Sequence, residues 1–306
     1  MIIVFKLMLK HSLIIFGLIF SVVVNAQLIE NINCHAFTEE PFFNLNFIKQ
    51  NKIKAINGEI RTKGNLEVIK DVKLVTRYEF DQEGKLTIQL GSFNTLGTKD
   101  TTFINYEYDD SLNLITKRTN DVYGFFSYNF TFDDKNRVLS KTYAREENVG
   151  KDRYHFELGK QYIIVNESYS YIDNDSIVVK SIYNNHNRVY QKDTYVYNEH
   201  NLLAEELRQF VINKKKAKTV YTYTEMGLME SKTLWKDLKK VKDFEKWAYK
   251  YDELGNLTYI DYYKGDVHTT HEEVLYDNAT FMLKALLVQD VASNFITIIK
   301  FTTEYY

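Results

Sequence analysis

Acidic residues occur as neighbouring pairs at several places in the chain, and paired carboxylates are the groups that a glycoside hydrolase uses. The pairs are Asp109–Asp110, Asp133–Asp134, Glu205–Glu206 and Glu272–Glu273. Such an enzyme needs its two carboxylates at a defined separation within a cleft. These pairs instead fall in predicted turns, or as neighbours on opposite faces of a strand. We therefore interpret them as solvated residues, and we predict no catalytic residue.

Two nearby histidines suggest a metal site. His268 and His271 are three positions apart, and Glu272 follows them directly. On a strand, residues three apart face opposite sides, so the two histidines would share a metal ion only if the segment bends. Without a bend they are surface residues, and we predict neither a metal site nor a cofactor.

The other residues that could take part in binding or catalysis have simpler explanations. The segment 173–176 resembles part of a calcium loop but lacks the Gly and the distant Glu, so we predict a turn. The basic run 214–218 fits an exposed turn. Trp235 and Trp247 could be sugar platforms, but at strand positions they are more often packing residues. Cys34 is the only cysteine, which excludes a disulfide framework and a cysteine-based zinc site; we interpret it as buried or incidental.

The composition excludes several classes of protein. Among 306 residues there are 39 Lys and Arg against 41 Asp and Glu, with 24 Tyr and 20 Phe. A chain so rich in aromatic residues is not intrinsically disordered. Its balanced charge gives no electrostatic reason to expect a nucleic acid as a partner.

The N-terminal residues 1–26 have the pattern of a secretory signal peptide. Lys6 and Lys10 precede a low-polarity run over 12–24, and a short-residue cleavage motif ends at Ala26. The run is shorter than the roughly 20 residues of a membrane helix, although an uncleaved N-terminal anchor is the alternative. We predict cleavage after Ala26 and export to the periplasm, the cell surface or the medium, with no membrane span in the mature chain.

A nine-residue pattern organises the rest of the chain. Its copies cover 78–86, 106–114, 130–138, 181–189, 195–203, 221–229, 249–257 and 274–282. The third position is aromatic, the ninth is apolar, and the fourth is Asp or Asn except at Thr224. The seventh is Gly or Asn in six of the eight copies, and these residues tolerate a positive φ.

These columns predict β-hairpins, in which an aromatic strand enters a type I turn and an aliphatic strand returns after a bulge. Leu112 and Thr280 occupy the seventh position in the two copies that lack Gly or Asn there, so their turns should be looser or of another type. The Asn57–Gly58 pair predicts a further hairpin. The half-length step between the copies at 181–189 and 195–203 fits turns at opposite ends of a meander. Together the hairpins imply on the order of 16 to 20 strands, and open sheets beyond about 10 strands usually curl, split or close.

The run Tyr-Lys-Tyr-Asp-Glu-Leu-Gly-Asn-Leu at 249–257 resembles the YD-repeat, or Rhs-type, signature. The resemblance extends over residues 78 to 282 and is specific at 249–257 and 106–114. It implies one long antiparallel sheet that spirals, and in very long members a hollow shell around a passenger polypeptide. This chain is too short for such a shell and shows no toxin or protease domain, so the resemblance implies a fold and no activity.

We therefore predict an all-β fold, a long antiparallel meander of repeated hairpins that forms a curled or spiral single sheet without a large helical domain. The predicted divisions are a signal peptide over 1–26, an N-terminal packing segment over 27–50 and a β-hairpin repeat domain over 51–306. The packing segment should cover one end of the sheet, with a short helix around 43–50.

The predicted function is that of an exported, non-enzymatic protein with a structural or binding role in the cell envelope or outside the cell. Its repeated tyrosines, such as Tyr197 and Tyr223, offer a surface for an envelope or extracellular protein or a polysaccharide. One alternative is an outer-membrane β-barrel, against which Glu205 and Glu206 place charge on both faces of a strand. The other alternative is a carbohydrate-directed enzyme.

Overall fold

The computed structural model describes residues 27–95, 98–121 and 124–306, so the predicted signal peptide lies outside the described residues. Within these ranges the chain forms one short helix and a single sheet of 18 strands. The elements are α2 (Leu45–Gln50), β1 (Ile53–Lys63), β2 (Lys70–Phe80), β3 (Leu86–Thr95), β4 (Thr98–Tyr108), β5 (Leu114–Asp121), β6 (Gly124–Phe132), β7 (Val138–Asn148), β8 (Leu158–Asn174), β9 (Ile177–Tyr183), β10 (Val189–Tyr197), β11 (Leu203–Phe210), β12 (Lys216–Tyr223), β13 (Met229–Trp235), β14 (Phe244–Tyr251), β15 (Leu257–Lys264), β16 (Val267–Tyr276), β17 (Leu283–Asp290) and β18 (Phe295–Tyr305).

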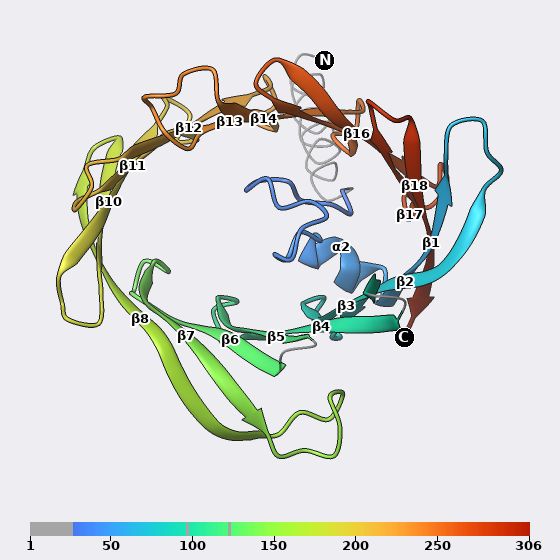
Figure 1. Cartoon of the computed structure of the whole chain (residues 1–306), viewed down its shortest axis with the longest axis horizontal. Coiled ribbons are helices and arrows are strands. Elements are labelled where there is room, and N and C mark those ends of the chain that lie inside the picture. The colour runs from blue at the N-terminus through green and yellow to red at the C-terminus, as the bar shows by residue number, and fades with distance from the viewer. Residues whose placement is uncertain (1–26, 96–97, 122–123) are drawn as a thin grey trace, which may run out of the picture.

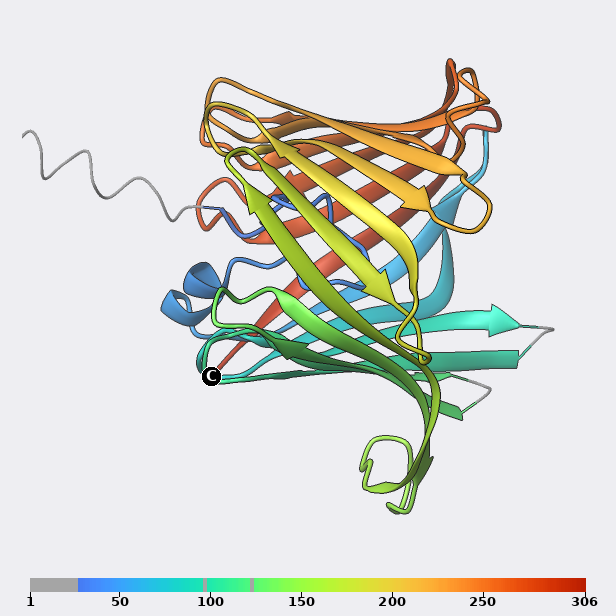
Figure 2. The same cartoon turned by 90° about the vertical axis from the view of Figure 1, so that its left-hand side faces the viewer.

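The sheet closes into a barrel. Every strand pairs antiparallel with its neighbours in the chain, and β1 also pairs with β18, so the strands form a complete ring (Figure 1). The strands that form the wall are inclined to the barrel axis (Figure 2). The predicted open, curled or spiral sheet is therefore wrong, although the expected strand number is right. Closure satisfies the N–H and C=O groups that two free edges would expose, and it depends on a pairing between the first and last strands that local sequence patterns do not reveal.

The predicted hairpin at Asn57–Gly58 is also wrong, because β1 runs straight through it. Gly58 lies opposite Thr76 of β2 and Phe301 of β18. A Cβ atom at this position would lie 2.5 Å from Cγ2 of Thr76 and 2.7 Å from Cγ2 of Ile299. Gly58 is thus needed for the close approach of side chains from both neighbouring strands, and not for a turn.

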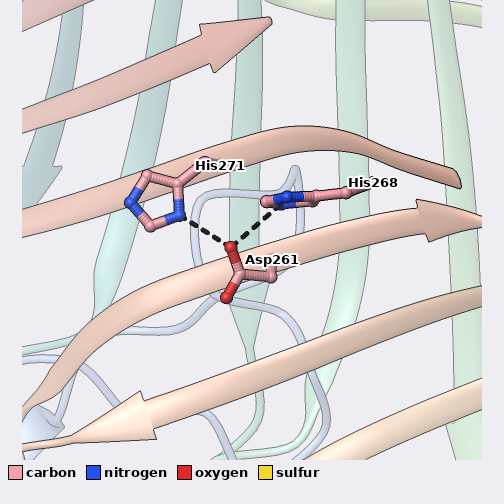
Figure 3. Close-up of side chains that lie close together, drawn as sticks. All are labelled: Asp261, His268 and His271. Atoms are coloured by element: carbon pink, nitrogen blue, oxygen red, sulfur yellow. Dashed lines mark hydrogen bonds and ion pairs between the residues drawn. The ribbon is translucent and has the colours of Figure 1, made fainter. Parts of the chain in front are cut away.

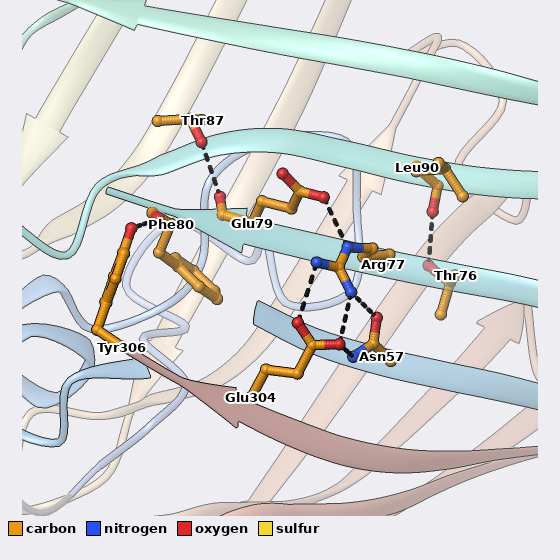
Figure 4. A network of polar contacts seen from close by, with 9 residues as sticks. All are labelled: Asn57, Thr76, Arg77, Glu79, Phe80, Thr87, Leu90, Glu304 and Tyr306. Carbon is orange, nitrogen blue, oxygen red and sulfur yellow. Dashed lines mark hydrogen bonds and ion pairs between the residues drawn. The ribbon is translucent and has the colours of Figure 1, made fainter. Parts of the chain in front are cut away.

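A polar network lies across the seam between β18, β1 and β2 (Figure 4). The guanidinium of Arg77 donates to both carboxylate oxygens of Glu304, at 3.0 and 3.2 Å, and to Glu79 at 2.6 Å. It also donates to the side-chain oxygen of Asn57, whose amide nitrogen donates to Glu304 at 2.9 Å. Each of the three strands therefore contributes a side chain to one hydrogen-bonded group.

The repeated pattern forms the predicted turns. In the turn after β4, the N–H groups of Ser111 and Asn113 both donate to Oδ1 of Asp109 at 2.9 Å. Two backbone hydrogen bonds close this turn, one from Asp109 N–H to Asn113 and one from Leu112 N–H to Asp109. The same pair of backbone bonds recurs in the turns that begin at Asp81, Asp133, Asn184, Asn198, Thr224 and Asp252.

The residue at the seventh position of the pattern determines the conformation of most of these turns, and the two copies without Gly or Asn at that position behave differently from each other. Gly255 has a φ of 83°, as the pattern predicts. Leu112 adopts a φ of 66° within the standard hydrogen-bonding pattern, so the prediction of a different turn there is wrong. The turn that contains Thr280 is indeed of another type, because it is one residue longer and places Phe281 at a φ of 58°. The turn after β9 lies at the opposite end of the barrel from the turns after β2, β4 and β6, as the half-length step predicts.

The N-terminal segment 27–52 lies inside the ring of strands, where Figure 1 shows it together with α2. Asn44 caps the helix by accepting from the N–H of Phe47 at 2.9 Å. An isolated bridge joins Ile29 to Phe43. The ring of Phe43 contacts the inward-facing rings of β2, including Phe80 at 5.1 Å. The segment therefore completes the hydrophobic core at one end of the barrel, where the helix lies against Gly84 of the turn after β2. The short helix is found as predicted, and only the open sheet that the segment was expected to cover is wrong.

Inward and outward positions alternate along the wall. Tyr249 and its partner Ile260 belong to the core that includes the N-terminal segment. Their neighbours in sequence, Ala248 and Asp261, form the next pair and point outward. The barrel thus has an apolar and aromatic interior at the level of the N-terminal segment.

No helix among the described residues is long and apolar enough to cross a membrane.

Candidate functional site

A cavity of about 760 Å³ lies between the N-terminal segment and the wall formed by β11 to β14. Amide and tyrosine side chains are prominent among its lining residues. The lining is Gln27, Glu30, Asn31, Ile32, Asn33, His35, Asn44, Asn201, Leu202, Leu203, Glu206, Tyr221, Tyr223, Gly227, Leu228, Met229, Lys232 and Tyr251. The volume is within the range of about 300 to 1,000 Å³ that is typical of small-molecule sites.

Hydrogen bonds between the segment and the wall fix one side of the cavity. The buried amide of Asn31 donates to the hydroxyl of Tyr251 at 3.3 Å, and its oxygen accepts from the N–H of Ala36 at 3.4 Å. The Tyr251 hydroxyl in turn donates to the carbonyl of Met229 at 2.7 Å. Burial raises the pKa of Tyr251 to about 12, so the hydroxyl stays protonated and remains a donor at neutral pH.

Several charged groups face the cavity. Glu206 accepts from the guanidinium of Arg208 at 3.1 Å and from the hydroxyl of Tyr221 at 3.5 Å. Lys232 lies over the ring of Trp247, with its nitrogen 5.3 Å from the ring centroid. Burial raises the pKa of the Glu30 carboxyl, because the charged form loses its hydration.

Two further groups of the N-terminal segment, Cys34 and His35, are half-buried at the cavity or next to it. Burial lowers the pKa of His35, which favours the neutral imidazole. Burial also raises the pKa of the Cys34 thiol, which lies within hydrogen-bonding reach of Tyr249. A thiol held in its neutral form is a poor nucleophile, in agreement with the interpretation of Cys34 as a buried or incidental residue.

This combination of groups suits binding through hydrogen bonds. Asn and Gln amides both donate and accept, and tyrosines offer a hydroxyl and an aromatic face. Sequence reasoning missed the cavity because its residues come from two distant parts of the chain, 27–44 and 201–251, that only the closed barrel brings together. The aromatic third position of the repeated pattern is the sequence signal that could have indicated the cavity, because Tyr223 and Tyr251 occupy this position and both face the cavity.

The paired carboxylates lie where the sequence indicates. Asp109 and Asp133 each accept backbone hydrogen bonds within a turn. In β11, Glu205 points outward to Lys218 at 2.7 Å while Glu206 faces the cavity. The pair at 272–273 is divided between the two faces of β16 in the same way. Glu206 and Glu30 do line one cavity, and this was not predicted from the sequence.

The two tryptophans do not form a joint platform. Trp235 pairs with the outward position of Phe244, and its indole N–H donates to the carbonyl of Val241 at 3.1 Å. Trp247 points inward and contacts the ring of Tyr262 at 5.0 Å.

The remaining predicted turns have structural partners. Asp173 accepts from Arg137 at 2.9 Å and forms an ion pair with Lys135 at 2.9 Å, so its carboxylate is already paired with cations. Asp175 adopts a φ of 43° and Lys214 a φ of 55°, which are turn conformations. The predicted turn at 214–218 is correct only at its start, because residues 216–218 belong to β12 and Ala217 is buried.

The histidines, in contrast, lie on one face. A bulge in the pairing of β15 with β16 lets Tyr262 pair with Thr270 while Tyr263 pairs with His268. The extra residue at Thr269 shifts the alternation, so His268 joins His271 on the outer face. Both contact Asp261 there (Figure 3). The expectation that they face opposite sides is therefore wrong, and the neighbouring Glu272 points inward.

Comparisons with known proteins found solved structures of low similarity. No family model and no curated protein matches the sequence. A porin-like protein from Bacteroides uniformis has a TM-score of 0.39 at 12% identity, over 82% of this chain and 98% of that one. A porin-like protein from Bacteroides vulgatus has a TM-score of 0.34 at 10% identity, over 83% and 98%. A DUF1329 family protein from Desulfovibrio piger has a TM-score of 0.25 at 9% identity, over 85% and 89%.

The prediction of a YD-repeat protein is corrected by these findings. No YD-repeat family model matches, and the spiral sheet that the resemblance implied is absent from the described residues, which form a closed ring. The repeated columns describe hairpin turns of a barrel. The architecture is the one named in the alternative expectation, a β-barrel, and this conclusion rests on the strand pairing.

Proposed function

We propose that this chain is an exported β-barrel of the cell envelope that binds a small, hydroxyl-rich ligand, such as a short glycan, in the cavity beside its N-terminal segment. The observation that carries the proposal is the cavity lining, where amides and tyrosines meet within a closed barrel. Ligands rich in hydroxyl groups need partners that both donate and accept hydrogen bonds, and aromatic faces suit the apolar faces of sugar rings.

We further propose that the role is binding without turnover. Glu206 is already engaged by Arg208 and Tyr221, which favours a role in orienting neighbouring groups. Glu30, with its raised pKa, has the character of a proton donor. Hydrolysis of a glycan by the full chain that is abolished by Glu30→Gln or Glu206→Gln, with folding intact, would replace this proposal by the carbohydrate-directed enzyme.

The outer wall supports a barrel in contact with water. Lys246 and Lys250 occupy alternate outward positions of β14, and Glu59 and Arg61 do so in β1. A wall in contact with lipid needs an apolar outward band across each strand, because a Lys or Arg at the bilayer midplane costs roughly 2 to 4 kcal/mol. Charged positions on these strands therefore favour an aqueous surrounding.

A buried ion pair on the outer wall points the same way. Arg118 contacts Glu146 at 2.5 Å, and both are almost fully buried. The ring of Phe156, from the loop after β7, covers the guanidinium at 4.3 Å. The loop thus folds back onto the outer face of the barrel and encloses a polar group there.

The second candidate function is an outer-membrane barrel. It is favoured by one specific observation, an even-numbered antiparallel ring whose interior holds a segment of its own chain, which is the arrangement of plugged outer-membrane barrels. In that case the charged outward positions would have to lie beyond the apolar part of the bilayer.

Fractionation separates the two candidates. The full chain, produced with its own N-terminus in a Gram-negative host, should appear in the detergent-free periplasmic or secreted fraction. Recovery only from detergent-extracted outer membranes would favour the membrane barrel.

Calorimetry with a panel of short glycans then tests the cavity. We expect that Tyr221→Phe and Glu206→Gln weaken binding about tenfold, in line with the loss of a hydrogen bond to a charged group. Tyr259→Phe, on the outer face, is the control and should bind as the parent does. Absence of binding throughout the panel, or equal affinities for all variants, would contradict the proposed site.

A further inference from the structure

The outer face of β15 and β16 carries a group of side chains outside the cavity. Asp261, His268 and His271 each offer a ligand atom, and these three atoms lie within 4.8 Å of one another. Oδ1 of Asp261 is 2.6 Å from Nδ1 of His271 and 3.0 Å from Nε2 of His268. Figure 3 shows both imidazole rings directed at the one carboxylate oxygen.

We infer that this group is a binding site for a divalent transition-metal ion, with Zn²⁺ as the reference ion. Two imidazole nitrogens and one carboxylate oxygen are ligands that Zn²⁺ accepts, at about 2.0 to 2.2 Å each. Ligands at that distance around a tetrahedral ion are about 3.3 Å apart. The separations of 2.6 and 3.0 Å therefore need to widen by less than 1 Å.

The local backbone is built so that the three groups meet. The bulge at Thr269 places His268 and His271 on the same face, although their spacing would separate them in a regular strand. Asp261 lies directly opposite His271 in the register of β15 and β16. One irregularity in the pairing therefore creates the ligand set.

Stacking holds the two imidazole rings in place. The ring of Tyr263 stacks on His268 with centroids 4.7 Å apart and an angle of 22°. The ring of Tyr259 stacks on His271 at 5.4 Å and 24°. The side chain of Asp261 is only 10% exposed. A site whose ligands are already oriented loses less conformational freedom when it binds an ion.

Protons occupy the positions that an ion would take. Both histidine nitrogens lie at hydrogen-bonding distance from Asp261, and Nε2 of His268 is also 3.0 Å from the carbonyl of Thr270. Because carboxylate and carbonyl oxygens only accept, each nitrogen carries a proton here. Binding of an ion moves this proton to the other ring nitrogen or to solvent, and three protein ligands leave a position for water.

Titration of the full chain tests the inference. The protein, purified without a histidine tag and treated with EDTA, is titrated with ZnCl₂ by calorimetry. One ion should bind per chain, and Asp261→Asn and His271→Gln should each weaken binding at least about tenfold. His155→Gln is the matched control, because His155 contacts a single carboxylate, that of Asp152, and should leave the affinity unchanged.

Two further measurements keep the test decisive. Thermal unfolding in EDTA checks that each variant folds as the parent does. ZnCl₂ should raise the midpoints of the parent and of His155→Gln by the same amount, and those of Asp261→Asn and His271→Gln by less. Should a variant fail to fold, the visible absorption of the Co²⁺-loaded parent decides, since imidazole and carboxylate ligands in a tetrahedral site give an intense band. The inference is overturned by the absence of one-to-one binding in the parent, by equal affinities of the parent and Asp261→Asn, or by a Co²⁺ spectrum identical to that of the free ion.

Discussion

Replacement of Gly58 by alanine probes the strand that closes the barrel. The added Cβ would lie 2.5 Å from Cγ2 of Thr76, 2.7 Å from Cγ2 of Ile299 and 2.9 Å from Cε1 of Phe301. All three separations are well below the roughly 3.5 to 4.0 Å at which carbon atoms attract each other. Since β2 and β18 both contribute to the crowding, β1 has no side toward which it could move freely.

The expected effect is large for a single methyl group. Overpacking of a well-packed interior typically costs about 1 to 3 kcal/mol, and contacts from both sides put Gly58→Ala in the upper half of that range, about 2 to 3 kcal/mol. Gly91→Ala is the control, because a Cβ there meets no atom within 4 Å. That change should be neutral or should stabilise the protein by up to about 1 kcal/mol, since alanine restricts the unfolded chain.

Urea unfolding of the full chain measures both effects from the midpoints and slopes. Thr76→Ser removes the nearest methyl group and keeps the hydroxyl that donates to the carbonyl of Leu90 at 3.1 Å. In the Gly58→Ala background this second change should restore at least about 1 kcal/mol, as a double-mutant cycle would report for residues in contact. Equal midpoints for Gly58→Ala and Gly91→Ala, or additive effects at positions 58 and 76, would refute the placement of β1 between β2 and β18.

Three further changes test other parts of the structure. Ile48 is fully buried within the barrel, and Ile48→Ala should lower the free energy of unfolding by about 2 to 5 kcal/mol. Ile32 is exposed, and Ile32→Ala should change the free energy of unfolding by less than about 0.5 kcal/mol. Burial raises the pKa of Glu272 to about 7 from its usual 4.5, so the folded state holds this proton more tightly. The free energy of unfolding should therefore fall by about 3 kcal/mol as the pH rises from below 4.5 to above 7, and Glu272→Gln should remove that part of the pH profile. Gly255→Val should destabilise by about 1 kcal/mol or more, because φ is 83° there and a Cβ would lie 2.2 Å from the side chain of Gln27; Leu254→Val, with a normal φ, should cost much less, and equal urea midpoints would count against the turn assignment.

The sequence predicted the local structure of the barrel well. Aromatic and apolar columns identified the strands, and the Asp, Asn and Gly columns identified the turns, because hairpin geometry depends on a few adjacent residues. Tyr221 and Tyr223 alternate with Val220 and Thr222, with the tyrosines toward the interior. These features extend over at most two strands.

Features that depend on distant segments could not be predicted in this way. The pair Asn57–Gly58 is typical of a hairpin turn. Only the close side chains of the two neighbouring strands explain why Gly58 instead lies within β1. Likewise, regular strand alternation would place Leu86 and Ile88 on one face, but a bulge in the pairing of β2 with β3 separates them. The group of Asp261, His268 and His271 could be predicted only with knowledge of a similar bulge at Thr269, because a shift of one residue moves every later side chain to the other face of the sheet.

The candidate site was hidden for the same reason. The N-terminal segment has few repeated features, and its polar residues, such as Asn31 and Glu30, gain meaning only through their position inside the ring. The expected number of strands was about right, yet the number alone did not distinguish an open sheet from a barrel. That distinction depended on the pairing of β1 with β18.

A disulfide across this seam tests the central claim most directly. Glu59 of β1 and Lys300 of β18 are direct partners on the outer face, at the Cα separation of neighbouring strands, about 4.5 to 5.5 Å, which a disulfide can bridge. The full chain with Cys34→Ser, Glu59→Cys and Lys300→Cys should form an intramolecular disulfide under mild oxidation, detected by mass spectrometry after proteolysis, whereas the control with Glu59→Cys and Lys250→Cys should not. A closed barrel predicts nearly complete cross-linking of the first pair, and an open or spiral sheet, in which β1 and β18 lie at opposite edges, predicts none.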